Sequence, residues 1–228
     1  MKRCVCGVAA ILFACWGTVQ TANAGCKDVP SPEVDWEGCS KQMLQLEGSD
    51  LAGANLQGAF LSGSVFHETN LAGAKLQRSE LLRTSFLGAD LTGANFEKAL
   101  ASRAVFEATV MKNANLNKAE FQRVSFDTAD LTGALMEEGD FVRNTFRNTN
   151  LTGVNFTGAL LPRSIFHGAN LKDVNFTRAY LYWSRFEGVD LSGVTGLTQA
   201  QLDMTCGDDK TVLPAGLTKP ARWPCGED

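Results

Sequence analysis

The sequence is poor in the residues that most enzymes use to move protons or bind metals, because its 228 residues contain only two histidines and two tyrosines. Its formal net charge of -4 gives no general attraction for nucleic acid or for an anionic membrane. A content of 44% hydrophobic and 20% charged residues excludes a disordered chain. We therefore expect a folded, non-enzymatic protein that needs no cofactor and binds no nucleic acid.

The first 24 residues have the pattern of a secretory signal peptide. Residues 2–3 are basic, residues 4–16 are apolar, and Ala22-Asn23-Ala24 forms a cleavage site of small residues before Gly25. The apolar stretch is too short for a membrane anchor, and no other stretch can span a bilayer. A loose lipobox before Cys15 makes a lipoprotein the alternative. We expect a mature chain that begins at Gly25, lacks a transmembrane segment and is periplasmic or secreted.

A repeat of five residues fills most of the remaining sequence. Every fifth residue from Leu46 to Leu191 is Leu, Phe or Met, with Ala101 as the exception. The residue two places earlier is small, except at Leu44 and Asn144. Helices and strands have periods of 3.6 and 2, so neither explains this spacing. A chain that turns once in every five residues would place both positions inward.

Local copies of the repeat read Ala54-Asn55-Leu56, Ala89-Asp90-Leu91, Ala94-Asn95-Phe96 and Ala169-Asn170-Leu171. They resemble the pentapeptide-repeat family, whose pattern is A-(D/N)-L-x-x, and the match covers residues 46–195. The resemblance implies an all-β solenoid, specifically a right-handed quadrilateral β-helix with four pentapeptides in each coil.

A second period of twenty residues agrees with four pentapeptides per coil. Phenylalanine recurs seven times at this spacing, at residues 66, 86, 106, 126, 146, 166 and 186. Stacking identical side chains along one wall of a solenoid is favourable, because each coil contacts only its neighbours. The repeats predict about 7.5 coils, which make a rod about 36 Å long at the usual spacing between strands.

We expect caps on both ends of the rod. The domains are then the signal peptide 1–24, an N-terminal cap 25–45, the repeat β-helix 46–195 and a C-terminal cap 196–228. Residues 198–201 fit a helix capping box, which predicts a short helix over about 198–205 followed by an irregular but packed tail. This ending is similar to that of many exported bacterial pentapeptide-repeat proteins.

Four cysteines remain after the signal peptide is removed, and an even number in an exported chain predicts disulfides. The caps stand at opposite ends of a rod of about 36 Å, whereas the Cα atoms of a disulfide lie within about 7 Å. Only pairing within each cap is then allowed, which joins Cys26 to Cys39 and Cys206 to Cys225. The caps are therefore expected to be stapled by disulfides.

Few residues are placed for chemistry. His67 and His167 are five coils apart and cannot share a metal. Four aspartates recur in the Asp/Asn position of the repeat, where their side chains are expected to bond local backbone; they are Asp50, Asp90, Asp130 and Asp190. No glycine-rich phosphate loop joins a strand to a helix. We expect neither a catalytic nor a metal-binding site.

Arginine recurs at a spacing of twenty on one outward side of the coil, at Arg83, Arg103, Arg123, Arg143 and Arg163. This column is either a solvated ladder with weak ion pairs to Glu80, Glu120 and Asp140, or a docking strip for anionic groups. Apolar residues mark the same side, namely Phe60, Leu82, Leu100, Val142, Leu160 and Pro162. Tyr180, Tyr182 and Trp183 extend the line, unless the tail 207–228 covers them. Arginine mixed with apolar residues is typical of an interface.

We therefore expect an exported scaffold protein that binds a protein or an anionic component of the cell envelope, or that forms a homodimer. The resemblance also suggests an alternative, because some members of the family mimic duplex DNA and interact with topoisomerases. That role requires the cytoplasm and an acidic rod, and both the signal peptide and the arginine column oppose it.

Overall fold

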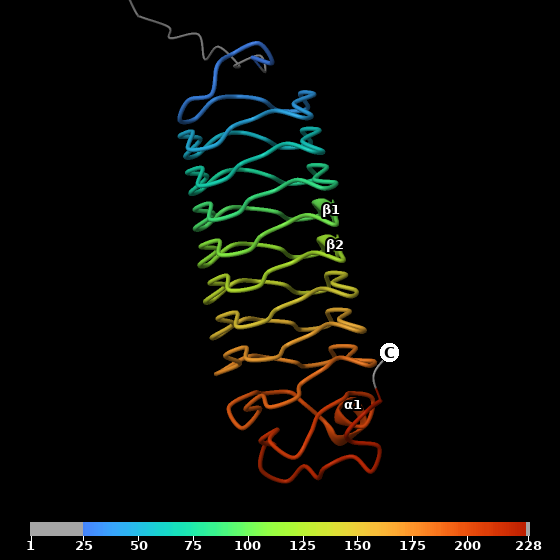
Figure 1. Cartoon of the computed structure of the whole chain (residues 1–228). Coiled ribbons are helices and arrows are strands. Elements are labelled where there is room, and N and C mark those ends of the chain that lie inside the picture. The colour runs from blue at the N-terminus through green and yellow to red at the C-terminus, as the bar shows by residue number, and fades with distance from the viewer. Residues whose placement is uncertain (1–24, 227–228) are drawn as a thin grey trace, which may run out of the picture.

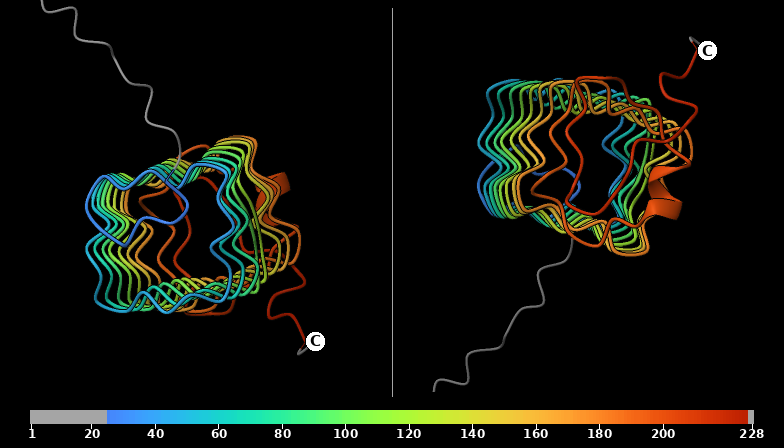
Figure 2. Two further views of the ribbon diagram at one scale, coloured as in Figure 1. Left: turned by 90° about the horizontal axis from the view of Figure 1, so that it is seen from above. Right: turned by 90° about the horizontal axis from the view of Figure 1, so that it is seen from below.

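The computed structural model describes residues 25–226, and the expected signal peptide lies outside this range. The chain winds into a stack of similar coils from the N-terminal to the C-terminal end (Figure 1). Seen along the stack, each coil has a four-sided outline (Figure 2). Parallel bridges join residues that are twenty apart, from Asp35 with Asn55 to Asn175 with Thr195. The period of twenty in the sequence is therefore the length of one coil.

Each side of a coil is one five-residue unit, as residues 51–55 illustrate. The central residue, Leu51, is fully buried, and the next two form a turn in which Gly53 has a φ of 67°. The corner residue, Ala54, is also buried and donates its N–H to the carbonyl of Leu51 at 3.0 Å. Asn55 then points outward and bridges the neighbouring coils. The corner lies close to the neighbouring backbone and favours a small side chain, which explains the small residue of the repeat.

Regular secondary structure is scarce because the chain turns after every bridge. The structure has two short parallel strands, β1 (Leu100–Ser102) and β2 (Glu120–Gln122), and one helix, α1 (Gln199–Leu202). Both strands lie on one side of the stack, and α1 lies near its C-terminal end (Figure 1). Isolated bridges supply the rest of the ladder among the described residues.

The core is a column of leucine and phenylalanine side chains from the central positions. Phe66 stacks on Phe86 with ring centroids 4.9 Å apart, and Phe166 stacks on Phe186 at 4.8 Å. These rings are buried to at least 99% of their surface. Because backbone bonds and ring stacking both connect coil to coil, the outward side chains of successive coils also form straight columns.

The two ends differ in detail from the sequence pattern. Bridging begins at Asp35, inside the expected cap 25–45, because Trp36 and Lys41 occupy central positions that leucine or phenylalanine fills elsewhere. Helix α1 is shorter than the expected 198–205, but Thr198 and Gln201 form the expected capping box. The coil register lengthens there, so that Arg185 bridges Cys206 and Asp190 bridges Val212.

Disulfides close both ends in the predicted pairing. Cys26 is joined to Cys39 and Cys206 to Cys225, each with Cα atoms 5.4 Å apart. The C-terminal tail is packed: Trp223 is 6% exposed, and its indole N–H donates to the carbonyl of Thr205 at 2.8 Å. The tail is thus fixed to the last coil by a covalent and a polar contact.

Candidate interaction surface

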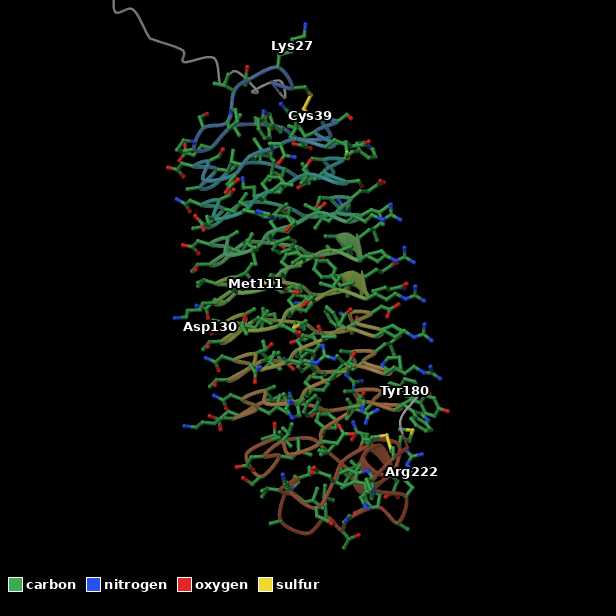
Figure 3. All side chains as sticks on the ribbon, in the orientation of Figure 1. Lys27, Cys39, Met111, Asp130, Tyr180 and Arg222 are labelled. Carbon is green, nitrogen blue, oxygen red and sulfur yellow. A yellow bond between two sulfur atoms is a disulfide. The ribbon has the colours of Figure 1, made fainter. Side chains whose placement is uncertain are left out.

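The five arginines of the column all occupy the second turn position of their units, where φ is 55–58°. Their backbone N–H groups are fixed to the next coil, as in the bond from Arg83 to the carbonyl of Ser102 at 2.9 Å and from Arg163 to Tyr182 at 2.8 Å. The side chains of all five are exposed. A row of nitrogen-tipped side chains projects from the edge of the stack above Tyr180 (Figure 3). The backbone is therefore rigid where the guanidinium groups are presented, at about 4.8 Å per coil.

We call the surface that carries this column the arginine side; it comprises residues 60–63 and the equivalent four residues of each following coil, down to 180–183. A shallow groove of about 430 Å³ runs along it. Four of the five arginines line the groove, together with apolar and small polar residues of the centre. The lining residues are Leu82, Ser102, Arg103, Gln122, Arg123, Val142, Arg143, Pro162 and Arg163. The sequence interpretation missed Ser102 and Gln122, although both continue the outward column of Leu82 at a spacing of twenty.

The arginines of the column form no ion pair with any residue of 25–226. The prediction of ion pairs between the column and Glu80, Glu120 and Asp140 is therefore wrong. Each of these carboxylates lies three residues before an arginine, which in nearly extended chain separates the two backbones by about 10 Å. Other cations do pair, as Lys118 does with Glu138 at 3.6 Å. The column thus presents uncompensated positive charge.

The opposite edge of the arginine side is acidic and apolar. A second hollow, of about 340 Å³, adjoins the groove and is lined by Glu80, Leu100 and Glu120 among others. Among the described residues, half of the exposed large apolar side chains lie on the arginine side, with exposed fractions of 39–48%. They are Phe60, Leu82, Leu100, Leu160, Tyr180 and Tyr182. Leu82 and Tyr182 lie between the two charged edges, and the other four continue the column of Glu80 and Glu120. Exposed apolar side chains beside charged ones are the composition expected of a binding surface.

The C-terminal tail covers only part of the aromatic end. Tyr180 and Tyr182 stack at 6.1 Å and remain 43% and 41% exposed. Trp183, which follows Arg163 in the column, is half-buried, and the guanidinium of Arg222 lies 6.0 Å from the centre of its ring. The tyrosines therefore remain available for contact, whereas Trp183 packs against the tail.

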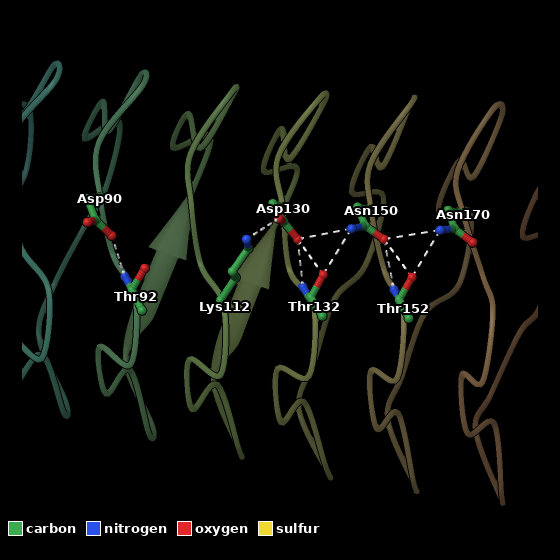
Figure 4. Close-up of polar contacts among 8 residues, drawn as sticks. All are labelled: Asp90, Thr92, Lys112, Asp130, Thr132, Asn150, Thr152 and Asn170. Atoms are coloured by element: carbon green, nitrogen blue, oxygen red, sulfur yellow. Dashed lines mark hydrogen bonds and ion pairs between the residues drawn. The ribbon is translucent and has the colours of Figure 1, made fainter.

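A polar ladder on a different side shows the structural use of the Asp/Asn position. The side chains of Asp50, Asp90, Asp130 and Asp190 each accept the backbone N–H two residues later, at 2.8–3.2 Å, which confirms the expected role. From Asp130 the ladder continues through Asn150 to Asn170 (Figure 4). Burial alone would raise the pKa of Asp130, but hydrogen bonds from Thr132 and the nearby charge of Lys112 lower this pKa below its usual value. The acidic residues of this side support the coil.

No group of three histidine, cysteine, aspartate or glutamate side chains within 25–226 is placed to hold a metal ion. His67 lies 2.8 Å from the hydroxyl of Ser85, and His167 is exposed. Over the same range, the structure contains no helix with the length and apolar character needed to cross a membrane.

Sequence comparison identifies the repeats. A family model described as a pentapeptide repeat region matches residues 79–156, and a model of pentapeptide repeats in eight copies matches residues 45–81 and 161–193. No curated protein sequence matches the chain.

Solved structures of similar fold include HetL of the cyanobacterium Nostoc sp. Strain PCC 7120, a pentapeptide repeat protein involved in regulating heterocyst differentiation. It is 23% identical over 83% of this chain and 88% of that chain, with a TM-score of 0.42. The plasmid-mediated fluoroquinolone resistance protein QnrB1 is 20% identical over 78% and 84%, with a TM-score of 0.42. A pentapeptide repeat protein of the Arabidopsis thaliana thylakoid lumen is 34% identical over 41% and 69%, with a TM-score of 0.35.

Proposed function

Because the chain belongs to the pentapeptide-repeat family, we propose that it is an exported, non-enzymatic interaction protein that binds an acidic protein surface along its arginine side. The coils are proposed to wind right-handed, with about 7.5 of them over residues 46–195. The rigid backbone of the rod holds the charges at fixed spacing, so that little backbone conformational freedom is lost on binding.

One observation carries the proposal: five exposed guanidinium groups stand one per coil, without an ion pair, beside a groove with an apolar centre. Arginine presents planar pairs of donors that match carboxylates. Leu82, Val142 and Pro162 in the same groove favour a protein partner, because a simple anion gains nothing from apolar contact. The positive column also opposes a role as a mimic of duplex DNA, which needs negative charge along the rod.

Export is the second part of the proposal. Residues 1–24 have the signal-peptide pattern, and two disulfides support an oxidising compartment. Cell fractionation followed by mass spectrometry of the intact protein should find a chain that begins at Gly25 in the periplasm or the medium. A chain lipidated at Cys15, or an uncleaved chain in the cytoplasm, would contradict this part.

Binding can be tested with fluorescent poly-L-glutamate as the acidic probe and residues 25–228 as the protein. The triple variant Arg103→Glu, Arg123→Glu and Arg143→Glu should bind at least about tenfold more weakly, which corresponds to about 1.4 kcal/mol. The control variant Arg78→Glu, Lys98→Glu and Arg178→Glu changes the net charge equally at the same turn position on another side. It should bind within about twofold of the wild type. Equal losses in the two variants, or none in either, would overturn the proposal.

A further inference from the structure

The arginine side carries opposite charges along its two edges. Arg83, Arg123 and Arg143 stand on one edge, and Glu80, Glu120 and Asp140 stand on the other, at the same coil levels. Within the described chain the carboxylates of Glu80 and Glu120 make no hydrogen bond or ion pair, and that of Asp140 accepts only from Gln122 and Val142. Both edges are thus free to pair with charges on another molecule.

The spacing of these charges restricts what can match them. Successive coils lie about 4.8 Å apart, whereas side chains on one face of an extended peptide recur at about 6.6 Å. A peptide strand laid along the column would therefore fall out of register within a few coils. Stacked coils joined by parallel bridges have the same spacing as the arginine column. This chain itself presents acidic residues on such stacked coils.

We propose that the arginine side binds a second copy of this chain, with the two rods parallel and the arginine edge of each facing the acidic edge of the other. A two-fold axis along the rods keeps each coil at the level of its counterpart and exchanges the two edges. Arg83 then faces Glu80 of the second copy, Arg123 faces Glu120, and Arg143 faces Asp140, with each pair formed twice. This inference rests on the proposed function and names the partner.

The antiparallel arrangement has the opposite consequence. A two-fold axis perpendicular to the rods places the arginine edges of the two copies on the same side of the interface. Arginine would then face arginine along the whole interface. Like charges in direct apposition disfavour that complex. The distribution of charge therefore selects one relative orientation of the two copies.

The centre of the arginine side also suits self-association. Leu82, Val142 and Tyr182 lie between the charged edges, close to the proposed axis, and each would meet the same residue of the second copy. The aliphatic stems of Arg103 and Arg163 in one copy would pack on Leu100 and Leu160 of the second copy, while the guanidinium groups stay in water. The apolar contact is thus central and the charges lie at the rim.

The size of the surface sets the strength of the association. Six coil steps and three residues of width give a footprint of roughly 290 Å², against about 800 Å² per partner in a standard interface. We therefore expect a reversible dimer that forms at high protein concentration. Sedimentation velocity of residues 25–228 should show an increase in the sedimentation coefficient between about 10 µM and about 1 mM, where weak complexes dissociate.

Charge reversal tests the pairing. One variant carries Arg83→Glu, Arg123→Glu and Arg143→Glu, and a second carries Glu80→Arg, Glu120→Arg and Asp140→Arg. Both changes suit the backbone, because Glu33, Glu68 and Glu138 occupy the same turn position and Arg185 occupies the same bridge position. Each variant alone should stay monomeric, whereas an equimolar mixture should associate. Arg78→Glu, Lys98→Glu and Arg178→Glu together should leave the wild-type association unchanged.

The outcomes separate this inference from the proposed function. Wild-type protein that stays monomeric throughout, or a mixture of the two variants that fails to associate, would overturn the homodimer. If poly-L-glutamate binding still depends on the arginine column in that case, the proposed function stands without it. Poly-L-glutamate should also dissociate the wild-type dimer, since the two partners share the arginine column, and a dimer that resists it would contradict the inference.

Discussion

Phe126 stacks on Phe146 of the next coil with ring centroids 5.1 Å apart and an interplanar angle of 0°. Twenty residues of chain separate the two rings, yet the coil places them face to face. Phe126 also stacks on Phe106 of the preceding coil, at 5.3 Å. A single ring therefore ties three coils together through the centre of the rod.

Replacing Phe126 tests this arrangement. Phe126→Ala should lower the free energy of unfolding by about 3–5 kcal/mol, because truncation of a buried aromatic leaves a cavity in a packed core. Glu107→Ala, whose side chain points outward, should change it by less than about 0.5 kcal/mol. Urea denaturation followed by circular dichroism measures both. Equal destabilisation by the two changes would show that the inward positions are assigned wrongly.

Asn144 is one of two residues that break the pattern of small corner residues, and the structure shows how it is accommodated. Its amide is fully buried, accepts the N–H of Val124 at 2.8 Å and donates to the carbonyl of Phe121 at 2.9 Å. Asn144→Ala should cost about 1–3 kcal/mol, since buried backbone groups lose their partners. Asn144→Ser should cost less, because the equivalent Ser164 donates to Phe141 at 2.8 Å. Thermal unfolding that ranks the serine variant below the alanine variant would contradict this account.

The sequence predicts the coil well because its central and corner positions repeat with only three exceptions, Ala101, Leu44 and Asn144. It places the start of the coil too late, because Trp36 and Lys41 depart from the leucine and phenylalanine pattern. In the structure the ammonium of Lys41 lies 3.8 Å from the centre of the Trp36 ring, and burial lowers its pKa against the opposing effect of Asp28. A charged residue in a core position is acceptable there because it lies at the end of the rod.

The candidate site is predicted only in part. The spacing of twenty identifies the arginine column, since it depends on the coil alone. It does not determine ion pairs, which depend on where long side chains end relative to one another. Nor does it show that Arg222 reaches Trp183, because the path of the tail depends on the Cys206–Cys225 disulfide and on Trp223.

The C-terminal disulfide should contribute substantially to stability. Cys206→Ala with Cys225→Ala opens a link between residues nineteen apart, and loops of this size are stabilised by about 3 kcal/mol in the chain-entropy model. We expect a corresponding fall in the urea midpoint of residues 25–228, measured by tryptophan fluorescence. An unchanged midpoint would show that the disulfide contributes nothing to the stability of the last coil.

The polar ladder should make stability depend on pH in acid. The folded-state pKa of Asp130 is lowered, so its ionised carboxylate stabilises the fold above the unfolded pKa, and this stabilisation is lost as the pH falls through the folded value. Asp130→Asn should therefore reduce the loss of stability below about pH 4. Asparagine fits the position, as Asn150 and Asn170 show. Urea midpoints at acid and neutral pH that respond identically in wild type and variant would contradict this assignment.

Binding through the arginine side should be strongly dependent on salt. Raising the ionic strength from about 0.01 M to about 0.15 M shortens the screening length from about 30 Å to about 8 Å, so the affinity for poly-L-glutamate should fall steeply. At the higher ionic strength, apolar contacts in the centre of the arginine side should retain some affinity for a folded partner. Fluorescence anisotropy across this range gives the slope, and a flat response would exclude the column as the binding element.

Arginine-specific labelling tests the central claim most directly, because it reads each guanidinium in the unmodified protein. Residues 25–228 are treated with phenylglyoxal, with and without poly-L-glutamate, and the labelled positions are quantified by mass spectrometry. We predict that Arg83, Arg103, Arg123, Arg143 and Arg163 become several-fold less reactive, while Arg78 and Arg178 on another side are unchanged. Equal protection of all seven arginines, or protection of none, would contradict the assignment of the arginine side as the interaction surface.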